Sequence, residues 1–383
     1  MRRNRDVVGI FVLMLGIFAY IMFVIKWNSD LPAHVYIAQQ MLEEHRLFST
    51  NFLMYFLINL LTLFTGYKYP MRAVLVVLLA IANTAKYTIV RNAFGEWTSA
   101  KTAKWAALAL LFVYIIPILY FLKPLGIFLS AENMYLGYCV PNVWHNSTIL
   151  CMMPFAIACY LLSVKQFKQY TDQRNKQIAL LLTLSILVKP SFFFVYVIAF
   201  PTVMLCQYGL HKPFFKSLLP LLVGGICLVY EYVTIYFHGG NDGSSVVIDI
   251  AQLFTLDFWQ SHILYLVVSI ALPLVFLCLY GRTIYRDPEF WFVLIMMACG
   301  FGILWCCQET GPRANDGNFG WQAIAAMWFV YFYILKTLIC NNEGAKAPYG
   351  GGYSQTALLL LYGLHVLMGF VYLGKFLITT DFG

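Results

Sequence analysis

The chain has 383 residues, of which 61% are hydrophobic and 11% are charged, and its formal net charge is +8. This composition excludes a water-soluble globular protein, because apolar runs of about 20 residues recur along the whole chain. Alternating ten-residue amphipathic strands, as in an outer-membrane barrel, do not occur. Nor does a basic stripe with interleaved aromatics, so the positive charge does not indicate nucleic-acid binding. The sequence predicts an all-α fold, a polytopic transmembrane helical bundle.

The first predicted element is a span at 8–27, preceded by a basic stretch. This run is too long for the hydrophobic region of a signal peptide, and no small-residue cleavage site follows it, so we expect a retained span. Further apolar runs of about 20 residues, the length that crosses a bilayer, predict about eleven spans in a single transmembrane domain over 1–383. The remaining limits are 71–90, 105–122, 145–163, 177–189, 191–207, 217–237, 262–281, 289–306, 320–339 and 355–376.

Basic residues fall unevenly on the two sides of these spans. With a cytoplasmic N-terminus, most of the 25 Lys and Arg residues lie in short inner flanks, as the positive-inside rule requires. This orientation makes 51–66 a non-spanning helix on the outer face, because counting it as a span would place the basic stretch 91–104 outside. A true span that breaks the rule is the alternative. The inner residues are Arg2, Arg3, Arg5, Arg91, Lys101, Lys104, Lys165, Lys168, Arg174, Lys176, Lys212, Lys216, Arg282, Arg286, Lys336 and Lys346.

The outer loops are the chemically varied ones. The first, at about 28–70, is long and expected to contain interfacial helices; the last covers about 307–319. Between them lie "SAENMYLGYCVPNVWHNSTIL" and "HGGNDGSSVVIDIAQLFTLDFWQSH". Because loops on a rigid scaffold carry function, we expect any reaction centre on the outer side.

Asp30 stands at the start of the first outer loop and has two interpretations. It can cap a short helix, since Asp accepts the unpaired N–H groups of a helix start and Pro32 is tolerated in the first turn. It can also be a general base toward a hydroxyl, held at the boundary between water and lipid. The helix that follows would place four residues on one stripe: His34, Ala38, Met41 and His45.

The layout of the whole chain resembles the GT-C superfamily of integral membrane glycosyltransferases. The resemblance lies in a first span, an Asp in a long outer loop with a lateral helix, and a second interfacial helix that ends in Gly ("FLINLLTLFTG"). It extends to "SDLPAH", "VPNVWHNSTIL", "LSILVKPSFFF" and "QETGPRANDGNFGW". It implies transfer of a sugar from a polyprenyl-phosphate donor to a glycan or lipid-linked acceptor on the outer face, with Asp30 as the catalytic base. Direct displacement at the anomeric carbon would invert its configuration.

Lys189, Glu309 and Arg313 are candidate substrate-binding residues. Lys189 interrupts an apolar run, and an ionisable residue at the membrane boundary is by default a functional candidate. A snorkelling lysine at a helix end is the structural alternative. Arg313 has a guanidinium that suits a phosphate, or it forms a simple pair with Glu309 or Asp316.

His145 and Asn146 lie at the outer start of the fourth predicted span. The resemblance implies that this position borders the active site. His145 is a candidate to assist the carrier phosphate or the base, and His34 and Asn146 are candidates for substrate contacts. Many superfamily members have an acid here, so the second catalytic position is open. A plain interfacial cluster with Trp144 is the alternative. Asn146-Ser147-Thr148 fits a glycosylation acceptor pattern, but its place next to the start of a span would hinder glycosylation sterically.

We expect no metal or other cofactor. The outer acids Asp242, Asp249 and Asp257 are scattered, without the oxygen cage of a calcium or magnesium site, although some GT-C enzymes use a divalent ion. The expected partners are the lipid-linked donor, the acceptor and the bilayer, and the expected location is a bacterial inner membrane, with a eukaryotic ER membrane as the alternative. Two other functions stay open: a lipid-linked polysaccharide polymerase or ligase, and a transporter or lipid flippase.

Overall fold

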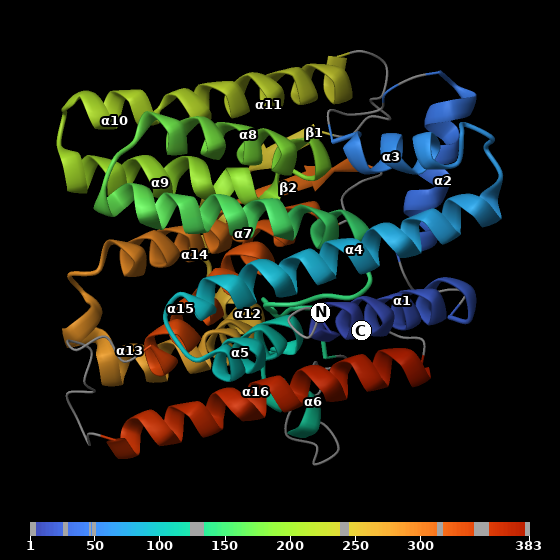
Figure 1. Ribbon diagram of the computed structural model, residues 1–383. Coiled ribbons are helices and arrows are strands. Elements are labelled where there is room, and N and C mark those ends of the chain that lie inside the picture. The colour runs from blue at the N-terminus through green and yellow to red at the C-terminus, as the bar shows by residue number, and fades with distance from the viewer. Residues whose placement is uncertain are drawn as a thin grey trace. The chain divides into compact units, whose positions relative to one another are not determined.

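The computed structural model (Figure 1) describes residues 5–25, 30–45, 47, 51–122, 134–237, 245–311, 317–340 and 352–379. Helices make up most of this part of the chain. Its strands are one pair of four residues each, β1 (Ser245–Ile248) and β2 (Cys307–Thr310). The predicted all-α class is confirmed.

Eight stretches among the described residues are helical, long and apolar enough to cross a membrane. A ninth span results if His262–Ser269 and Ala271–Ile284, which meet at 54°, count as one. These helices fit an integral membrane protein in a lipid bilayer. The eight are α1 (Arg5–Phe23), α4 (Lys68–Gly95), α7 (Ser147–Lys168), α9 (Ser191–Tyr208), Lys212–Thr234 with α10 (Lys212–Ser217) and most of α11 (Leu219–Phe237), α14 (Pro288–Cys306), η5 (Asn318–Gly320) with α15 (Trp321–Ile339), and α16 (Gly352–Thr379).

Two of the eleven expected spans are not among these nine. The stretch 177–189 forms α8 (Asp172–Val188), whose 17 residues measure about 26 Å, slightly less than the bilayer core. The stretch 105–122 is interrupted, with α5 (Ala100–Phe112) followed by the five-residue α6 (Ile118–Leu122). Pro117 explains the interruption, because proline has no N–H to donate and disfavours helical backbone in the residue before it.

The chain divides into two compact units. The first contains Met1–Val90, Trp144–Val246 and Glu309–Gly317; the second contains Arg91–Val143, Val247–Gln308 and Asn318–Gly383. The expectation of a single transmembrane domain stays a prediction.

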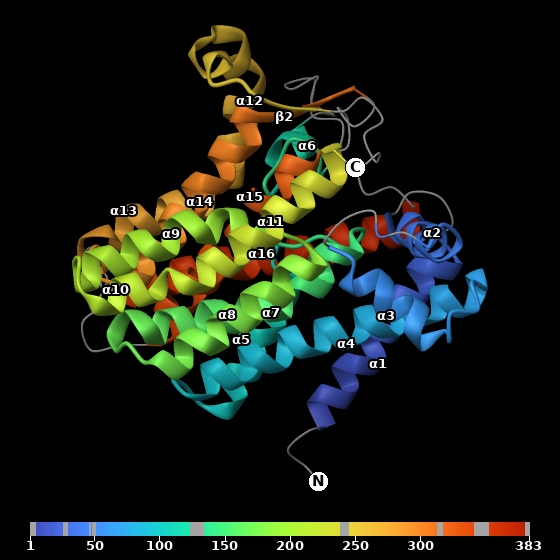
Figure 2. The same cartoon turned by 90° about the horizontal axis from the view of Figure 1, so that it is seen from above.

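In the first unit, α7, α8, α9 and α11 run side by side (Figures 1 and 2). At one end of this group, α2 (Asp30–Glu43) packs on α3 (Leu53–Leu61), and these two helices also contact α7 and α8. Asn59 joins the pair by donating to the carbonyl oxygen of Ala38 at 2.9 Å. With nine residues, α3 is about 14 Å long and too short to cross a bilayer, as expected for 51–66.

The predicted stripe on α2 is partly wrong. The buried face consists of Leu31, Val35, Ala38 and Met41, whereas His34 is half-buried. His45 lies beyond the end of the helix, exposed, with a φ of 48°. A left-handed residue just past a helix terminates it, so His45 cannot continue the stripe.

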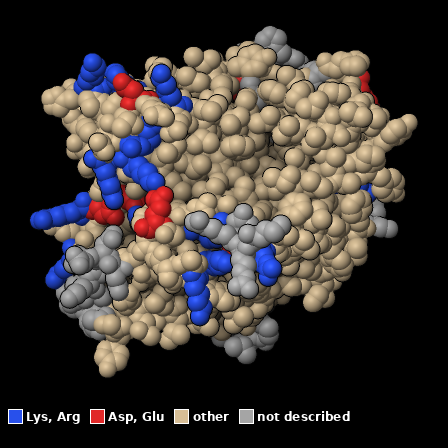
Figure 3. All heavy atoms as spheres, viewed as in Figure 1, with Lys and Arg blue, Asp and Glu red and all other residues tan. Residues whose placement is uncertain are grey.

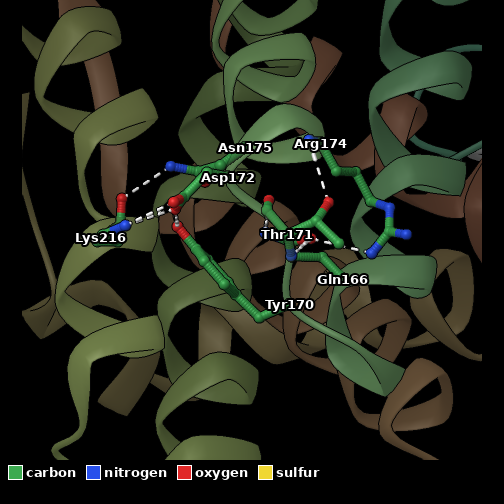
Figure 4. Close-up of polar contacts among 7 residues, drawn as sticks. All are labelled: Gln166, Tyr170, Thr171, Asp172, Arg174, Asn175 and Lys216. Atoms are coloured by element: carbon green, nitrogen blue, oxygen red, sulfur yellow. Dashed lines mark hydrogen bonds and ion pairs between the residues drawn. The ribbon is translucent and has the colours of Figure 1, made fainter.

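The turn between α7 and α8 is closed by side-chain hydrogen bonds (Figure 4). Thr171 caps α8, and Gln166 both donates to the carbonyl oxygen of Thr171 and accepts from its N–H, at 3.1 Å each. Asp172 pairs with Lys216 of α10 at 2.6 Å, and Asn175 donates to the carbonyl oxygen of Lys216 at 2.8 Å. These bonds fix α10 to the start of α8.

Basic residues gather at this same end of the first unit. Figure 3 shows Lys and Arg side chains over α10 and the neighbouring turn. The α7–α8 turn and the α9–α10 connection contribute the six inner basic residues predicted for this part of the chain: Lys165, Lys168, Arg174, Lys176, Lys212 and Lys216.

In the second unit, side chains satisfy the backbone of the interruption between α5 and α6. Asn142 donates to the carbonyl oxygens of Val113 and Leu110 at 2.7 and 3.2 Å, and the Trp328 indole also donates to Leu110, at 3.0 Å. The imidazole Nδ1 of His365 contacts the carbonyl oxygen of Tyr114 at 2.7 Å. Non-helical backbone persists in a membrane only where its polar groups are paired, and these side chains provide the partners.

Gly369 of α16 lies against the end of α5, which gives a stability prediction. A Cβ at this position would lie 1.5 Å from the carbonyl oxygen of Phe112, which is backbone and cannot swing away. We expect Gly369→Ala to destabilise the protein by about 3 kcal/mol or more, measured as loss of monodisperse protein and a lower Tm in detergent. Gly374→Ala on the same helix, where a Cβ meets nothing within 4 Å, is the control and should leave Tm unchanged or slightly higher.

Candidate functional site

Asp30 is held by a residue far away in the sequence. The Asn146 side chain donates from Nδ2 to Oδ2 of Asp30 at 2.9 Å, which joins the start of α2 to the start of α7. Asn146 is itself the N-cap of α7, because its Oδ1 accepts from the N–H of Ile149 at 3.1 Å. Thr148 also donates to this Oδ1, at 2.9 Å. With Oδ1 fixed by two donors, the amide must present its N–H toward Asp30.

The same chain of bonds continues to a cation. Nζ of Lys189 donates to Oγ1 of Thr148 at 3.2 Å. Asp30, Asn146, Thr148 and Lys189 therefore form one hydrogen-bonded series, here called the Asp30–Lys189 chain. It brings a carboxylate and an ammonium group together from three separate parts of the sequence.

Lys189 is placed by a break between two helices. It caps the C-terminus of α8, and Pro190 directly precedes α9, so the chain turns at this point. Two carboxylates, Asp30 and Glu231, lie within electrostatic range of Lys189. Glu231 is 9% exposed, on α11. This site therefore contains more acidic than basic charge when Glu231 is ionised.

A second pair of polar groups lies beside Asp30. Nδ1 of His34 and the hydroxyl of Tyr55 are 2.8 Å apart, and their rings stack with centroids 5.8 Å apart. Burial and, to a smaller degree, the nearby Lys189 lower the pKa of His34 to about 4, against the opposing effect of Asp30. Burial and the Asp30 charge raise the pKa of Tyr55. At neutral pH both groups are uncharged, so His34 contributes hydrogen bonds to the site rather than positive charge.

His145, a candidate to assist the carrier phosphate or the base, lies in the protein interior. It lies just before the candidate span of α7 and is 2% exposed. Burial lowers the pKa of its imidazole to about 3, which leaves the ring neutral at pH 7. Trp144 is 2% exposed as well, and its ring lies 6.1 Å from that of Phe18. Both side chains belong to the protein interior, unlike the exposed side chains of an interfacial aromatic belt.

Two of the predicted site residues, Glu309 and Arg313, come from the last predicted outer loop. Glu309 lies half-buried on β2 and belongs to the same unit. Arg313, with Asp316 and Asp242, lies outside the described residues. No group of three or more His, Cys, Asp or Glu among the residues described here could hold a metal ion, and the expectation of no metal stays a prediction.

The Asp30–Lys189 chain lies at the end of α7 that is far from the basic turn. Asn146 precedes the first residue of α7, whereas Lys165, Lys168 and Arg174 surround its last turn. The 22 residues between these ends span about 33 Å, close to the full bilayer core. The carboxylate and the ammonium group therefore lie at the face of the first unit opposite its basic loops.

Thr148 and Tyr55 are site residues that the sequence did not reveal. Thr148 falls in the pattern Asn146-Ser147-Thr148, which fits a glycosylation acceptor but also contains the signal for a helix N-cap. Asn before an apolar run caps a helix, and the cap fixes where the side chains of the first turn point.

Comparison of this chain with known protein families, with curated proteins and with solved structures gives no match.

Proposed function

We propose that this protein is a membrane glycosyltransferase of GT-C type, which transfers a sugar from a polyprenyl-phosphate donor to an acceptor hydroxyl. The observation that carries this proposal is the Asp30–Lys189 chain, in which a base and a cation are fixed beside each other at the end of a membrane helix. Sugar transfer from a lipid phosphate needs a base for the acceptor hydroxyl and a cation for the leaving phosphate, and it involves no redox or carbanion step. The sequence layout described above supports the same class.

In the proposed reaction, Asp30 accepts the proton of the acceptor hydroxyl as the hydroxyl oxygen forms a bond to the anomeric carbon. The bond between that carbon and the phosphate oxygen breaks, and the electron pair leaves with the lipid phosphate. Lys189 stabilises the negative charge that develops on the leaving group. Asn146 binds Oδ2 of Asp30, which directs the other carboxylate oxygen toward substrate. This single displacement inverts the anomeric configuration.

The positive-inside rule supports the outer face as the side of the reaction. The Asp30–Lys189 chain lies about one bilayer thickness from the basic α7–α8 turn, and basic loops are retained in the cytoplasm. The expected setting is the cytoplasmic membrane of a bacterium, within synthesis of a cell-envelope polysaccharide. A transporter is less well supported, because transporters place their substrate sites near the bilayer midplane and this chain lies at the helix ends.

Purified protein in lipid nanodiscs, supplied with a panel of synthetic polyprenyl-phosphate sugars carrying a radioactive label and with a panel of glycan and lipid-linked acceptors, tests the proposal. We expect transfer from at least one donor, with a product whose anomeric configuration is opposite to that of the donor. Transfer with retention would contradict the single displacement. Absence of transfer from every donor, in protein with a cooperative thermal transition, would contradict the proposed class and favour a polymerase, ligase or transporter.

Asn146 has two roles that a pair of variants can separate. Asn146→Ala removes the cap of α7 and the donor to Asp30, whereas Thr171→Ala removes the equivalent cap of α8 at the other membrane face. We expect both to lower the free energy of unfolding by about 1 kcal/mol, measured by thermal unfolding in nanodiscs. Only Asn146→Ala should also lower kcat. Equal loss of transfer in the two variants would mean that Asn146 acts through stability alone.

A further inference from the structure

Residues 247–256 run from the second half of β1 to the first residue of α12 (Leu256–Ser269), and their polar and apolar side chains have an unusual distribution. Five apolar residues of this segment are exposed: Val247 by 44%, Ile248 by 68%, Ile250 by 55%, Phe254 by 86% and Leu256 by 78%. Large apolar side chains exposed this closely along the chain are candidates for an interaction surface.

One polar residue of this segment, Gln252, bonds to the end of α14 and to β2, and Asp249 and Thr255 bond to Gln252. Oδ1 of Asp249 accepts from the N–H of Gln252 at 3.3 Å, and Gln252 donates to the carbonyl oxygen of Trp305 and accepts from Gln308 at 2.9 Å. Oγ1 of Thr255 donates to the carbonyl oxygen of Gln252 at 2.8 Å. These bonds pair the side chains of Asp249, Gln252 and Thr255, of which Thr255 is itself exposed. Exposed apolar side chains beside paired polar groups suit a loop surrounded by lipid.

Hydrogen bonds fix the level of this segment along the membrane normal. The N–H of Asp249 donates to the carbonyl oxygen of Cys306 at 2.8 Å, so the segment is tied to the last residue of the candidate span α14. Trp259 of α12 packs against Trp305, with ring centroids 5.9 Å apart. Tryptophans gather where the hydrocarbon core meets the headgroups, and this pair lies at the end of a span. The segment then continues into the next candidate span, which begins at His262.

The other end of α14 shows which leaflet is involved. Arg282 lies in the last turn of the helix Ala271–Ile284, and Arg286 lies in the connection that precedes α14. The 19 residues of α14 measure about 28 Å. By the positive-inside rule the arginines face the cytoplasm, and Cys306 faces outward.

We propose that residues 247–256 form an in-plane membrane anchor, whose apolar side chains rest among the lipids of the outer leaflet. The occupant of this surface is the bilayer itself, at the boundary between headgroups and acyl chains. The continuity of the segment with the ends of two candidate spans carries the inference. It does not depend on the proposed glycosyl transfer.

The test uses the full chain with p-benzoylphenylalanine, a photoreactive residue, at single exposed positions, reconstituted in nanodiscs of phosphatidylcholine and phosphatidylglycerol. Intact mass after illumination reports lipid adducts. Leu360, 68% exposed in the candidate span of α16, is the positive control, and Asp172, whose side chain is 60% exposed at the basic turn, is the negative control. We expect lipid adducts at Phe254 and Leu256 at half or more of the yield at Leu360, and at least tenfold above Asp172.

Two results would overturn the anchor. Adducts at Phe254 and Leu256 no more frequent than at Asp172, with normal adducts at Leu360, would place the segment in water. Crosslinks from these positions to a second protein chain, in place of lipid, would make the surface an interface between copies. Because the side chains of Phe254, Leu256 and Leu360 are exposed and apolar, the variants at these three positions should keep the wild-type Tm, which the same preparations can confirm.

Discussion

Asp30→Asn is expected to lower the rate of sugar transfer by about a hundredfold to ten-thousandfold, the usual contribution of a general base. Asn is nearly the same shape as Asp, and its side-chain oxygen can still accept the hydrogen bond from Asn146. The substitution therefore removes the negative charge and the proton acceptor while it preserves the connection between α2 and α7. Initial rates at saturating donor, with Tm recorded on the same preparation, measure the effect.

Glu43→Gln provides a matched control on the same helix. Glu43 is an exposed carboxylate at the last position of α2, and it accepts a hydrogen bond from Gln39 at 2.8 Å. We expect this variant to transfer sugar at the wild-type rate. If Asp30→Asn also retained most of its activity, Asp30 would be a structural residue that positions α2, and another group would have to act as the base.

The sequence predicted much of the fold because a membrane imposes strong local signals. Apolar runs coincide with the eight candidate spans. The uneven distribution of Lys and Arg predicted a non-spanning helix at 51–66, and α3 in this stretch is too short to cross a bilayer. Asp30, Asn146 and Lys189 were recognisable since each is a polar residue next to a long apolar run. Each of these three residues lies at a helix end, and the fold brings these ends together.

The sequence could not supply what depends on packing. The imidazole of His145 can assist a phosphate group, but its burial in the protein keeps it neutral. Thr148 and Tyr55 are ordinary residues until α2, α3, α7 and α8 bring them beside Asp30 and Lys189. The interruption after Phe112 has a local cause in Pro117, yet its survival depends on Asn142, Trp328 and His365, which come from distant parts of the chain.

Lys189→Met should produce the second large loss of activity. The methionine side chain keeps most of the lysine stem but removes the ammonium group that would face the phosphate. We expect kcat to fall by about a hundredfold to a thousandfold, as when one stabilising donor is removed from a developing anion. Lys216→Met, at the basic turn of the same unit, is the control and should leave kcat unchanged, because its ammonium group pairs with Asp172.

The loss in Lys189→Met must be separated from a loss of stability, because Asp30 and Glu231 would both lose the cation that lies near them. Lys189→Arg makes this separation. Arginine retains the positive charge, so it should restore Tm to the wild-type value, yet its planar guanidinium cannot reproduce the compact ammonium group that donates to Thr148. A role in phosphate stabilisation therefore predicts wild-type Tm with partial kcat in Lys189→Arg, and low kcat in Lys189→Met at any Tm. A lysine that merely snorkels predicts wild-type kcat in both variants, and that result would remove Lys189 from the mechanism while leaving Asp30 as the base.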